Sequence, residues 1–159
     1  MASRSGRIAP VILRVFARRS YGFECNDTQQ GSGVSITSVL IIDDSPTDLL
    51  ILSALLDLCG GYEVAQAPNG SAALKMLADR RADVCLVDFD MPGMTGLEFT
   101  IEARSLRPEQ CCILVTGAPP ADLATAAEQA GVHTIVSKAS LSPQLLDATI
   151  QAAIGARLQ

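Results

Sequence analysis

Short runs rich in Val, Ile and Leu alternate with longer amphipathic segments from residue 39 to the end of the chain. Such runs are typical of buried parallel strands, and the segments between them have helical spacing. The predicted strands are Val39–Ile42, Tyr62–Gln66, Asp83–Val87, Cys111–Val115 and Val132–Val136. The predicted helices are Pro46–Cys59, Gly70–Arg80, Leu97–Leu106, Pro120–Ala130 and Ser142–Leu158. Five strands alternating with five helices predict an α/β, doubly wound fold, a five-stranded parallel sheet with helices on both faces.

Local signals support the first of these helices. Ser45 is a favourable N-cap residue, and Pro46 suits the first helical position. Gly60 and Gly61 end the helix. Three of the helices show an inward stripe, which consists of Leu49, Leu52, Leu56 and Cys59 in the first, Ala73, Leu74 and Leu77 in the second, and Leu146, Ile150, Ala153 and Ile154 in the last.

Charge is distributed unevenly along the 159 residues. The chain has a net charge of -5, but residues 1–37 carry five arginines against one Glu and one Asp, which leaves the remainder at -8. A body this acidic does not suit nucleic acid, because neutralising phosphates requires clustered Lys and Arg. The five cysteines lack metal-ligand spacing and indicate core residues of a reducing, cytoplasmic protein. No apolar run reaches membrane-spanning length, so no membrane partner is expected.

Residues 1–37 show no strand or core pattern, and residues 26–38 have the composition of a linker. An Arg-rich start of this kind is compatible with an organelle transit peptide. We favour a disordered extension or a start codon assigned too early, and we place the folded domain at residues 38–159.

Polar and charged residues follow the apolar strands directly. They are Asp43 and Asp44 after the first predicted strand, Asp88 and Asp90 after the third, Thr116 after the fourth and Lys138 after the fifth. Because the carboxyl ends of parallel strands meet at one edge of a sheet, these side chains are expected to lie together. Carboxylates in close proximity repel each other, and Mg²⁺ would relieve that repulsion. The arrangement suggests phosphoryl transfer to a carboxylate, with the lysine and the threonine contacting the phosphoryl oxygens.

Four motifs resemble those of the receiver domain of bacterial two-component response regulators. They are Val39–Ser45, Asp88–Gly96, Val115–Ala118 and Val136–Lys138, and both their order and their spacing agree with that family. The resemblance covers about Val39 to Leu158. It implies a flavodoxin-like sheet with strand order 2-1-3-4-5.

By this resemblance, Asp88 accepts a phosphoryl group from the phosphohistidine of a histidine kinase or a histidine phosphotransfer protein. The implied ligands of Mg²⁺ are the carboxylates of Asp43, Asp44 and Asp88 and the backbone carbonyl of Asp90. Thr116 is the implied switch hydroxyl, and Lys138 pairs with the phosphoryl group. The resemblance makes the chain a phosphoacceptor that assists its own phosphorylation and dephosphorylation rather than an enzyme acting on other substrates.

The resemblance also implies a stand-alone, chemotaxis-type regulator whose output is a protein-binding surface. That surface consists of the fourth predicted helix, the fifth strand and the fifth helix.

Three positions depart from the family pattern. Ile135 stands where an aromatic residue usually follows the switch, Ala139 replaces the proline after Lys138, and Thr95 replaces a common Asp before Gly96. Since a cis bond before a non-proline residue is costly, we predict a trans Lys138–Ala139 bond.

Two other functions stay open at this point. Asp88 and Asp90 also resemble the Asp-x-Asp pair of haloacid-dehalogenase-type phosphatases, in which they would be nucleophile and general acid/base. The sequence context differs, since in those enzymes this strand usually comes first and further acidic ligands follow the lysine. A receiver that serves only as a docking surface is the other alternative. His133, the only histidine, is predicted to be structural.

Overall fold

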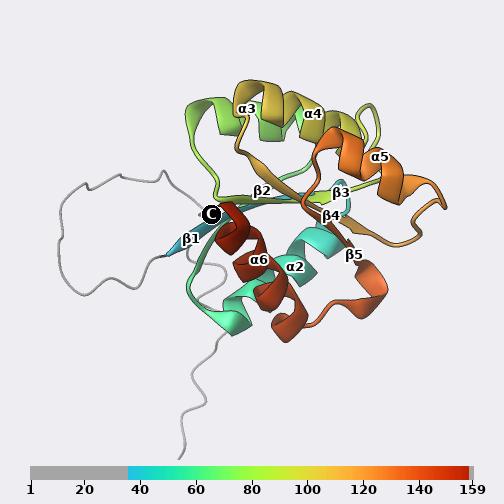
Figure 1. The fold of residues 1–159 in the computed structure, drawn as a ribbon. Coiled ribbons are helices and arrows are strands. Elements are labelled where there is room, and N and C mark those ends of the chain that lie inside the picture. Colours follow the sequence, from blue (N-terminus) through green and yellow to red (C-terminus); the bar gives the residue numbers. More distant parts are fainter. Residues whose placement is uncertain (1–35, 158–159) are drawn as a thin grey trace, which may run out of the picture. The chain divides into compact units, whose positions relative to one another are not determined.

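The computed structural model describes residues 36–157, so the predicted extension lies outside the described residues, apart from its last two positions. Within residues 36–157, five strands form one parallel sheet in the order β2-β1-β3-β4-β5 (Figure 1). The strands are β1 (Thr37–Ile42), β2 (Tyr62–Ala67), β3 (Val84–Asp88), β4 (Cys111–Thr116) and β5 (Thr134–Ser137). The helices are α2 (Pro46–Cys59), α3 (Gly70–Asp79), α4 (Gly96–Leu106), α5 (Leu123–Ala130), the 3-10 turn η1 (Lys138–Ser140) and α6 (Pro143–Arg157). The predicted fold class and strand order are confirmed.

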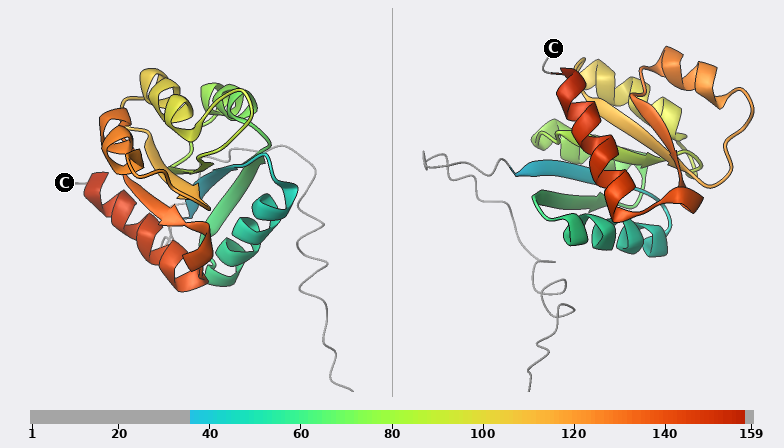
Figure 2. Two further views of the ribbon diagram at one scale, coloured as in Figure 1. Left: turned by 90° about the vertical axis from the view of Figure 1, so that its right-hand side faces the viewer. Right: turned by 60° about the horizontal axis from the view of Figure 1, so that its bottom comes forward.

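Alternate residues of the strands face two separate cores. Helices α2 and α6 cover one face of the sheet, and α3, α4 and α5 cover the other (Figures 1 and 2). In β1, Val39 and Ile41 pack toward α2 and α6, whereas Leu40 and Ile42 pack toward α3 and α4. Side chains alternate between the two faces of a strand, and helices cover both faces here, so the buried strands are apolar on both sides.

Most of the predicted inward stripes are buried. The exceptions are Cys59, Leu74 and Ile154, which are partly buried at the margin of the core. Cys59 lies in the last turn of α2, where its thiol donates to the carbonyls of Leu55 and Pro143. The side chain of His133 is exposed, and its backbone N–H donates to the carbonyl of Cys112 at the start of the β4–β5 pairing.

Most element boundaries lie within one residue of the predictions, but the starts of β1, α5 and β5 differ by two or three residues. Helix α5 begins at Leu123 rather than Pro120, because residues 120–122 form a turn in which the Leu123 N–H donates to the Pro120 carbonyl. Strand β5 begins at Thr134 rather than Val132. The left-handed Gly131 ends α5, and the Val132 N–H donates to the Ala127 carbonyl of that helix cap, so it is not available to the sheet.

Three of the five cysteines and the Lys138–Ala139 bond follow the predictions. Cys85, Cys111 and Cys112 are buried free thiols, and Cys25 lies outside the described residues. Burial raises the pKa of Cys111 to about 11, as expected for an unreactive core thiol. No cis peptide bond occurs within residues 36–157, so the Lys138–Ala139 bond is trans. None of the described helices is both long and apolar enough to cross a membrane.

Gly96 fixes the loop that follows Asp88, and Gly96→Ala is expected to destabilise the fold. A Cβ at this position would lie 2.5 Å from the carbonyl oxygen of Asp88 and 2.7 Å from Leu114 Cδ2. The contact with the Asp88 backbone cannot be relieved by a side-chain rotation, so we expect a loss of about 1–3 kcal/mol in the free energy of unfolding. Urea denaturation measures this loss.

Gly155→Ala provides the matched control. Gly155 is an exposed residue of α6, and an added Cβ there would meet nothing within 4 Å. Alanine in a helix interior is more stable than glycine by roughly 0.5–1 kcal/mol. A Gly96→Ala variant as stable as the Gly155→Ala variant would contradict the close contact at Asp88.

Candidate functional site

The ammonium group of Lys138 lies between three carboxylates at the carboxyl edge of the sheet. Lys138 directly follows β5, and its Nζ lies 2.8 Å from Asp43 Oδ2, 2.7 Å from Asp48 Oδ2 and 2.7 Å from Asp88 Oδ1. Asp43 follows β1, Asp88 ends β3, and Asp48 belongs to the first turn of α2. Lys138 therefore joins three carboxylates from three other parts of the chain, as the topology of the sheet requires for residues at one edge.

The surrounding backbone holds the first of these carboxylates in place. The backbone N–H of Asp43 donates to the carbonyl of Ala67, and Asp43 Oδ1 accepts a 2.9 Å hydrogen bond from the N–H of Ser45. The other oxygen of Asp43 accepts from Lys138. Because Asp43 is only 1% exposed, both of its oxygens need these partners.

Burial and charge shift two pKa values at the site. Burial raises the pKa of Asp88 and the neighbouring Asp43 carboxylate raises it further, while the hydrogen bond from Lys138 opposes this rise. Burial alone would lower the pKa of Lys138. Its hydrogen bonds to three carboxylates outweigh this effect and raise the pKa, so the lysine stays charged at neutral pH.

Three of the predicted metal ligands lie together. Single carboxylate oxygens of Asp43, Asp44 and Asp88 lie within 4.8 Å of one another. Asp44 is exposed, whereas the other two are buried, so the group opens to solvent on one side. Hard oxygen donors with room for water suit Mg²⁺, and these residues fit that ion. Asp90 is exposed in the loop after β3, and the ligation by its backbone carbonyl stays a prediction.

Thr116 ends β4 at the same edge and is 2% exposed. In the sheet register it lies opposite Ser137, while Asp88 lies opposite Val115. No hydrogen bond joins the Thr116 hydroxyl to Asp88 or Lys138 within residues 36–157. Ile135 lies opposite Leu114 and packs, partly buried, against the core under α3, α4 and α5. The switch role of Thr116 therefore stays a prediction.

Asp48 is the residue that the sequence analysis missed. Its backbone N–H donates to Ser45 Oγ, the N-cap of α2. In the sequence, an acidic residue three positions after an N-cap serine is typical of an ordinary first helical turn. The signal in the sequence that could have identified Asp48 is its position. It lies in the first turn of the helix that follows β1, and this helix starts at the edge where the other charged residues lie. Its contact with Lys138, which is 90 residues away, depends on how α2 and β5 are arranged in the fold.

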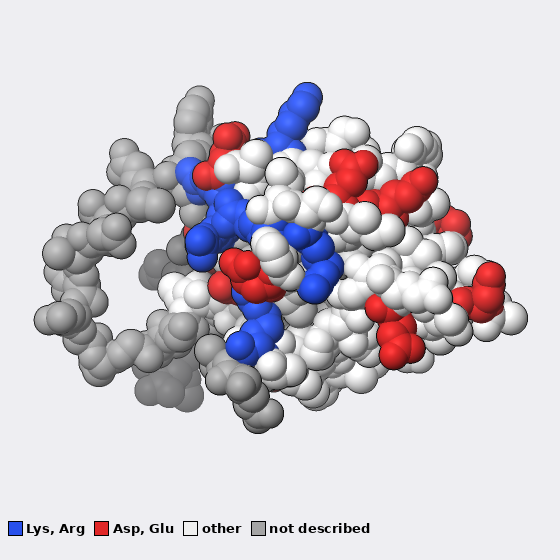
Figure 3. Space-filling model, turned by 45° about the horizontal axis from the view of Figure 1, so that its top comes forward, with Lys and Arg blue, Asp and Glu red and all other residues white. Residues whose placement is uncertain are grey.

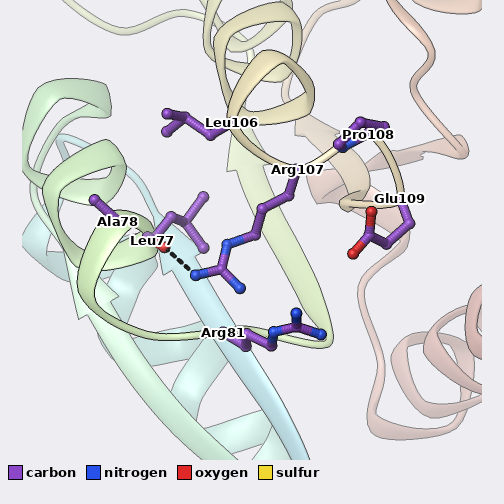
Figure 4. Close-up of a pocket in the computed structure, with 7 residues that line it drawn as sticks. All are labelled: Leu77, Ala78, Arg81, Leu106, Arg107, Pro108 and Glu109. Carbon is purple, nitrogen blue, oxygen red and sulfur yellow. Dashed lines mark hydrogen bonds between the residues drawn. The ribbon is translucent and has the colours of Figure 1, made fainter.

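A further cavity lies elsewhere, between the ends of α3 and α4 (Figure 4). It has a volume of about 460 Å³, and its lining includes Leu77, Arg81, Arg107 and Glu109. Lys and Arg side chains also gather on one side of the face seen in Figure 3. The Arg107 guanidinium donates to the carbonyl of Leu77 in the last turn of α3, as a cation that stabilises a helix C-terminus does. Helix α3 ends where β3 begins, so this cavity is at the opposite edge of the sheet from Asp88.

Comparison with known proteins agrees with this fold and site. The family model of the response regulator receiver domain matches residues 39–150. The chain belongs to this family. It is 34% identical over 102 residues to the chemotaxis protein CheY of Pseudomonas aeruginosa, which covers 63% of this chain and 82% of that protein. A putative transcriptional regulator of the same organism is 32% identical over 111 residues, which covers 70% of this chain and 54% of the relative.

Solved receiver structures share the fold. A CheY-like receiver domain protein from Methanospirillum hungatei has a TM-score of 0.71 at 27% identity, covering 77% of this chain and 97% of that one. The response regulator TrrA from Thermotoga maritima, solved in complex with Mg²⁺ and BeF, has a TM-score of 0.66 at 28% identity, covering 74% and 98%. The matches to the first three curated relatives cover 54%, 45% and 29% of their lengths.

Proposed function

We propose that this chain accepts a phosphoryl group on Asp88 in a Mg²⁺-dependent reaction and signals through a protein-binding surface. The observation that carries the proposal is the 2.7 Å contact between Lys138 Nζ and Asp88 Oδ1, beside the carboxylates of Asp43 and Asp44. A buried carboxylate at the open edge of the sheet is a suitable nucleophile. A fixed cation next to it offsets the negative charge of an incoming phosphoryl group.

In the proposed reaction, a carboxylate oxygen of Asp88 forms a bond to phosphorus while the bond between phosphorus and the donor's histidine nitrogen breaks. The imidazole nitrogen leaves with the electron pair, and Asp88 becomes an acyl phosphate. Four groups would hold Mg²⁺, namely the carboxylates of Asp43, Asp44 and Asp88 and the backbone carbonyl of Asp90. When bound, the ion would supply positive charge to the phosphoryl oxygens. The ammonium of Lys138 donates to the same oxygens. Hydrolysis of the acyl phosphate resets the protein.

The proposed signal is a change in the population of a two-state surface. The Thr116 hydroxyl donates to the phosphoryl group and draws the end of β4 with it. The surface of α5, β5 and α6 reports the change to a downstream protein. Ile135, in place of the usual aromatic residue, lacks a polar tip, so here the response is carried by repacking against α5 rather than by an outward-facing hydroxyl.

The proposed donor is a sensor histidine kinase or a histidine phosphotransfer protein of the cytoplasm. Membership of the receiver domain family supports this assignment. The acidic character of the domain disfavours nucleic acid as a direct partner. We place the receiver domain at residues 38–159.

The test is the intact mass of the protein after incubation with Mg²⁺ and a small acyl-phosphate donor. We expect a gain of one phosphoryl group that mild alkali removes, and no gain when a chelator replaces Mg²⁺. A folded protein that binds Mg²⁺ but gains no mass, either from the small donor or from phosphorylated kinase, would show a docking-only receiver. Steady release of phosphate from phosphomonoesters would instead support the phosphatase alternative.

A further inference from the structure

We propose that Asp48 is a positioning residue that weakens the hold of Lys138 on the phosphoryl group and so shortens the life of the acyl phosphate. This inference rests on the proposed function. It starts from the 2.7 Å ion pair between Asp48 Oδ2 and Lys138 Nζ, which none of the predicted roles in the site uses.

The lysine has no spare donor in the structure. An ammonium group has three N–H donors, and Lys138 forms hydrogen bonds to Asp43 and Asp48 and an ion pair with Asp88 at 2.7 Å. A phosphoryl group on Asp88 can take over the donor that now contacts Asp88. It has three oxygens and could accept a second donor, but Asp48 retains one by a charged hydrogen bond.

Asp48 is the partner that the reaction does not otherwise need. Asp88 is the proposed acceptor, and Asp43 is a candidate metal ligand that is 1% exposed. Asp48 lies on α2, outside the carboxylate group that could hold the metal, with its side chain 32% exposed. Its negative charge lowers the effective positive charge that Lys138 presents to the phosphoryl oxygens.

The lysine has room to redirect its ammonium group. A groove of about 190 Å³ lies between α2 and the chain after β5, and it is lined by Asp48, Ile51, Leu52, Leu55, Lys138 and Leu141. The aliphatic part of Lys138 lies along apolar side chains there, so the ammonium group can exchange partners without leaving a buried gap. Without the Asp48 carboxylate, two donors could therefore turn toward the phosphoryl group.

Asp48 also has an ordinary structural effect, since an acidic residue in the first turn of a helix stabilises that helix. Stability therefore does not test the proposal. The readout is the affinity for beryllofluoride at saturating Mg²⁺, followed by the shifts of backbone amide resonances, together with the half-life of the acyl phosphate. The chain has no Trp for a fluorescence titration.

We expect Asp48→Asn to bind beryllofluoride roughly three- to tenfold more tightly than the wild type, and to lengthen the half-life of the acyl phosphate by a similar factor. Asp48→Glu, which keeps the carboxylate, should be close to the wild type. Asp57→Asn removes an exposed carboxylate further along the same helix and controls for net charge. In a Lys138→Met background, the effect of Asp48→Asn should disappear, because Asp48 acts on the phosphoryl group only through Lys138.

Equal or weaker binding by Asp48→Asn, with normal binding by the wild type, would overturn the role of Asp48 and leave the proposed function intact. An effect that persists in the Lys138→Met background would overturn the route through the lysine. Failure of the wild type to bind beryllofluoride or to gain a phosphoryl group would overturn the proposed function, and this inference with it.

Discussion

Asp88→Asn should gain no phosphoryl group under conditions that phosphorylate the wild type. An amide oxygen at this position is a poor nucleophile, so we expect the rate of phosphoryl gain to fall by at least about 10³-fold. Asn has nearly the same shape as Asp, and its oxygen can still accept from Lys138, which lies 2.7 Å from Asp88. The measurement is a time course of intact mass with Mg²⁺ and a small acyl-phosphate donor.

The fold of this variant should be at least as stable as that of the wild type. Burial raises the pKa of Asp88 above its usual value of 3.8, so the folded state binds this proton more tightly than the unfolded state. The ionised carboxylate therefore lowers the free energy of unfolding as the pH rises from about 3.8 through the raised pKa. Asp88→Asn removes this cost, and urea denaturation at pH 7 checks it. A stable variant that still gains a phosphoryl group at the wild-type rate would place the acceptor elsewhere, for instance at Asp44.

The sequence predicted the grouping of Asp43, Asp44, Asp88 and Lys138 because parallel strands alone determine it. Each of these residues ends a buried strand or lies within two residues of its end, and all carboxyl ends of a parallel sheet lie at one edge. Neither loop geometry nor helix packing is needed to bring them together. The strand order 2-1-3-4-5 came from the family resemblance, since alternating strands and helices are compatible with several orders.

Features that depend on packing between elements were not predictable in this way. Asp48 meets Lys138 only because the first turn of α2 lies beside the end of β5, and no local pattern encodes that contact. The start of β5 was misplaced because Val132 is as apolar as a strand residue, yet its N–H is used by the cap of α5. Hydropathy does not record which of two hydrogen-bonding partners a backbone group takes.

Lys138→Met should destabilise the fold strongly in the absence of divalent cations. The substitution keeps an unbranched, apolar stem in the groove beside Leu141 but removes the ammonium group that contacts Asp43, Asp48 and Asp88. Removing one partner of a buried ion pair leaves an uncompensated charge, which costs about 3–5 kcal/mol. The side chain of Lys138 is 23% exposed, so we expect about 3 kcal/mol, measured by urea denaturation. Lys75→Met, at an exposed position of α3, should change stability by less than about 0.5 kcal/mol.

Mg²⁺ should restore most of the stability that Lys138→Met loses, because the ion and the lysine neutralise the same carboxylates. At a concentration 100 times its dissociation constant, a ligand specific for the folded state contributes about 2.7 kcal/mol. The gain from Mg²⁺ should also be larger in Lys138→Met than in the wild type, since in the wild type the cation competes with Lys138 for the oxygens of Asp43 and Asp88. Equal gains in the two proteins would mean that the metal binds apart from the lysine. In that case, Asp43, Asp44 and Asp88 would not form the single charged centre that the proposed phosphoryl transfer requires.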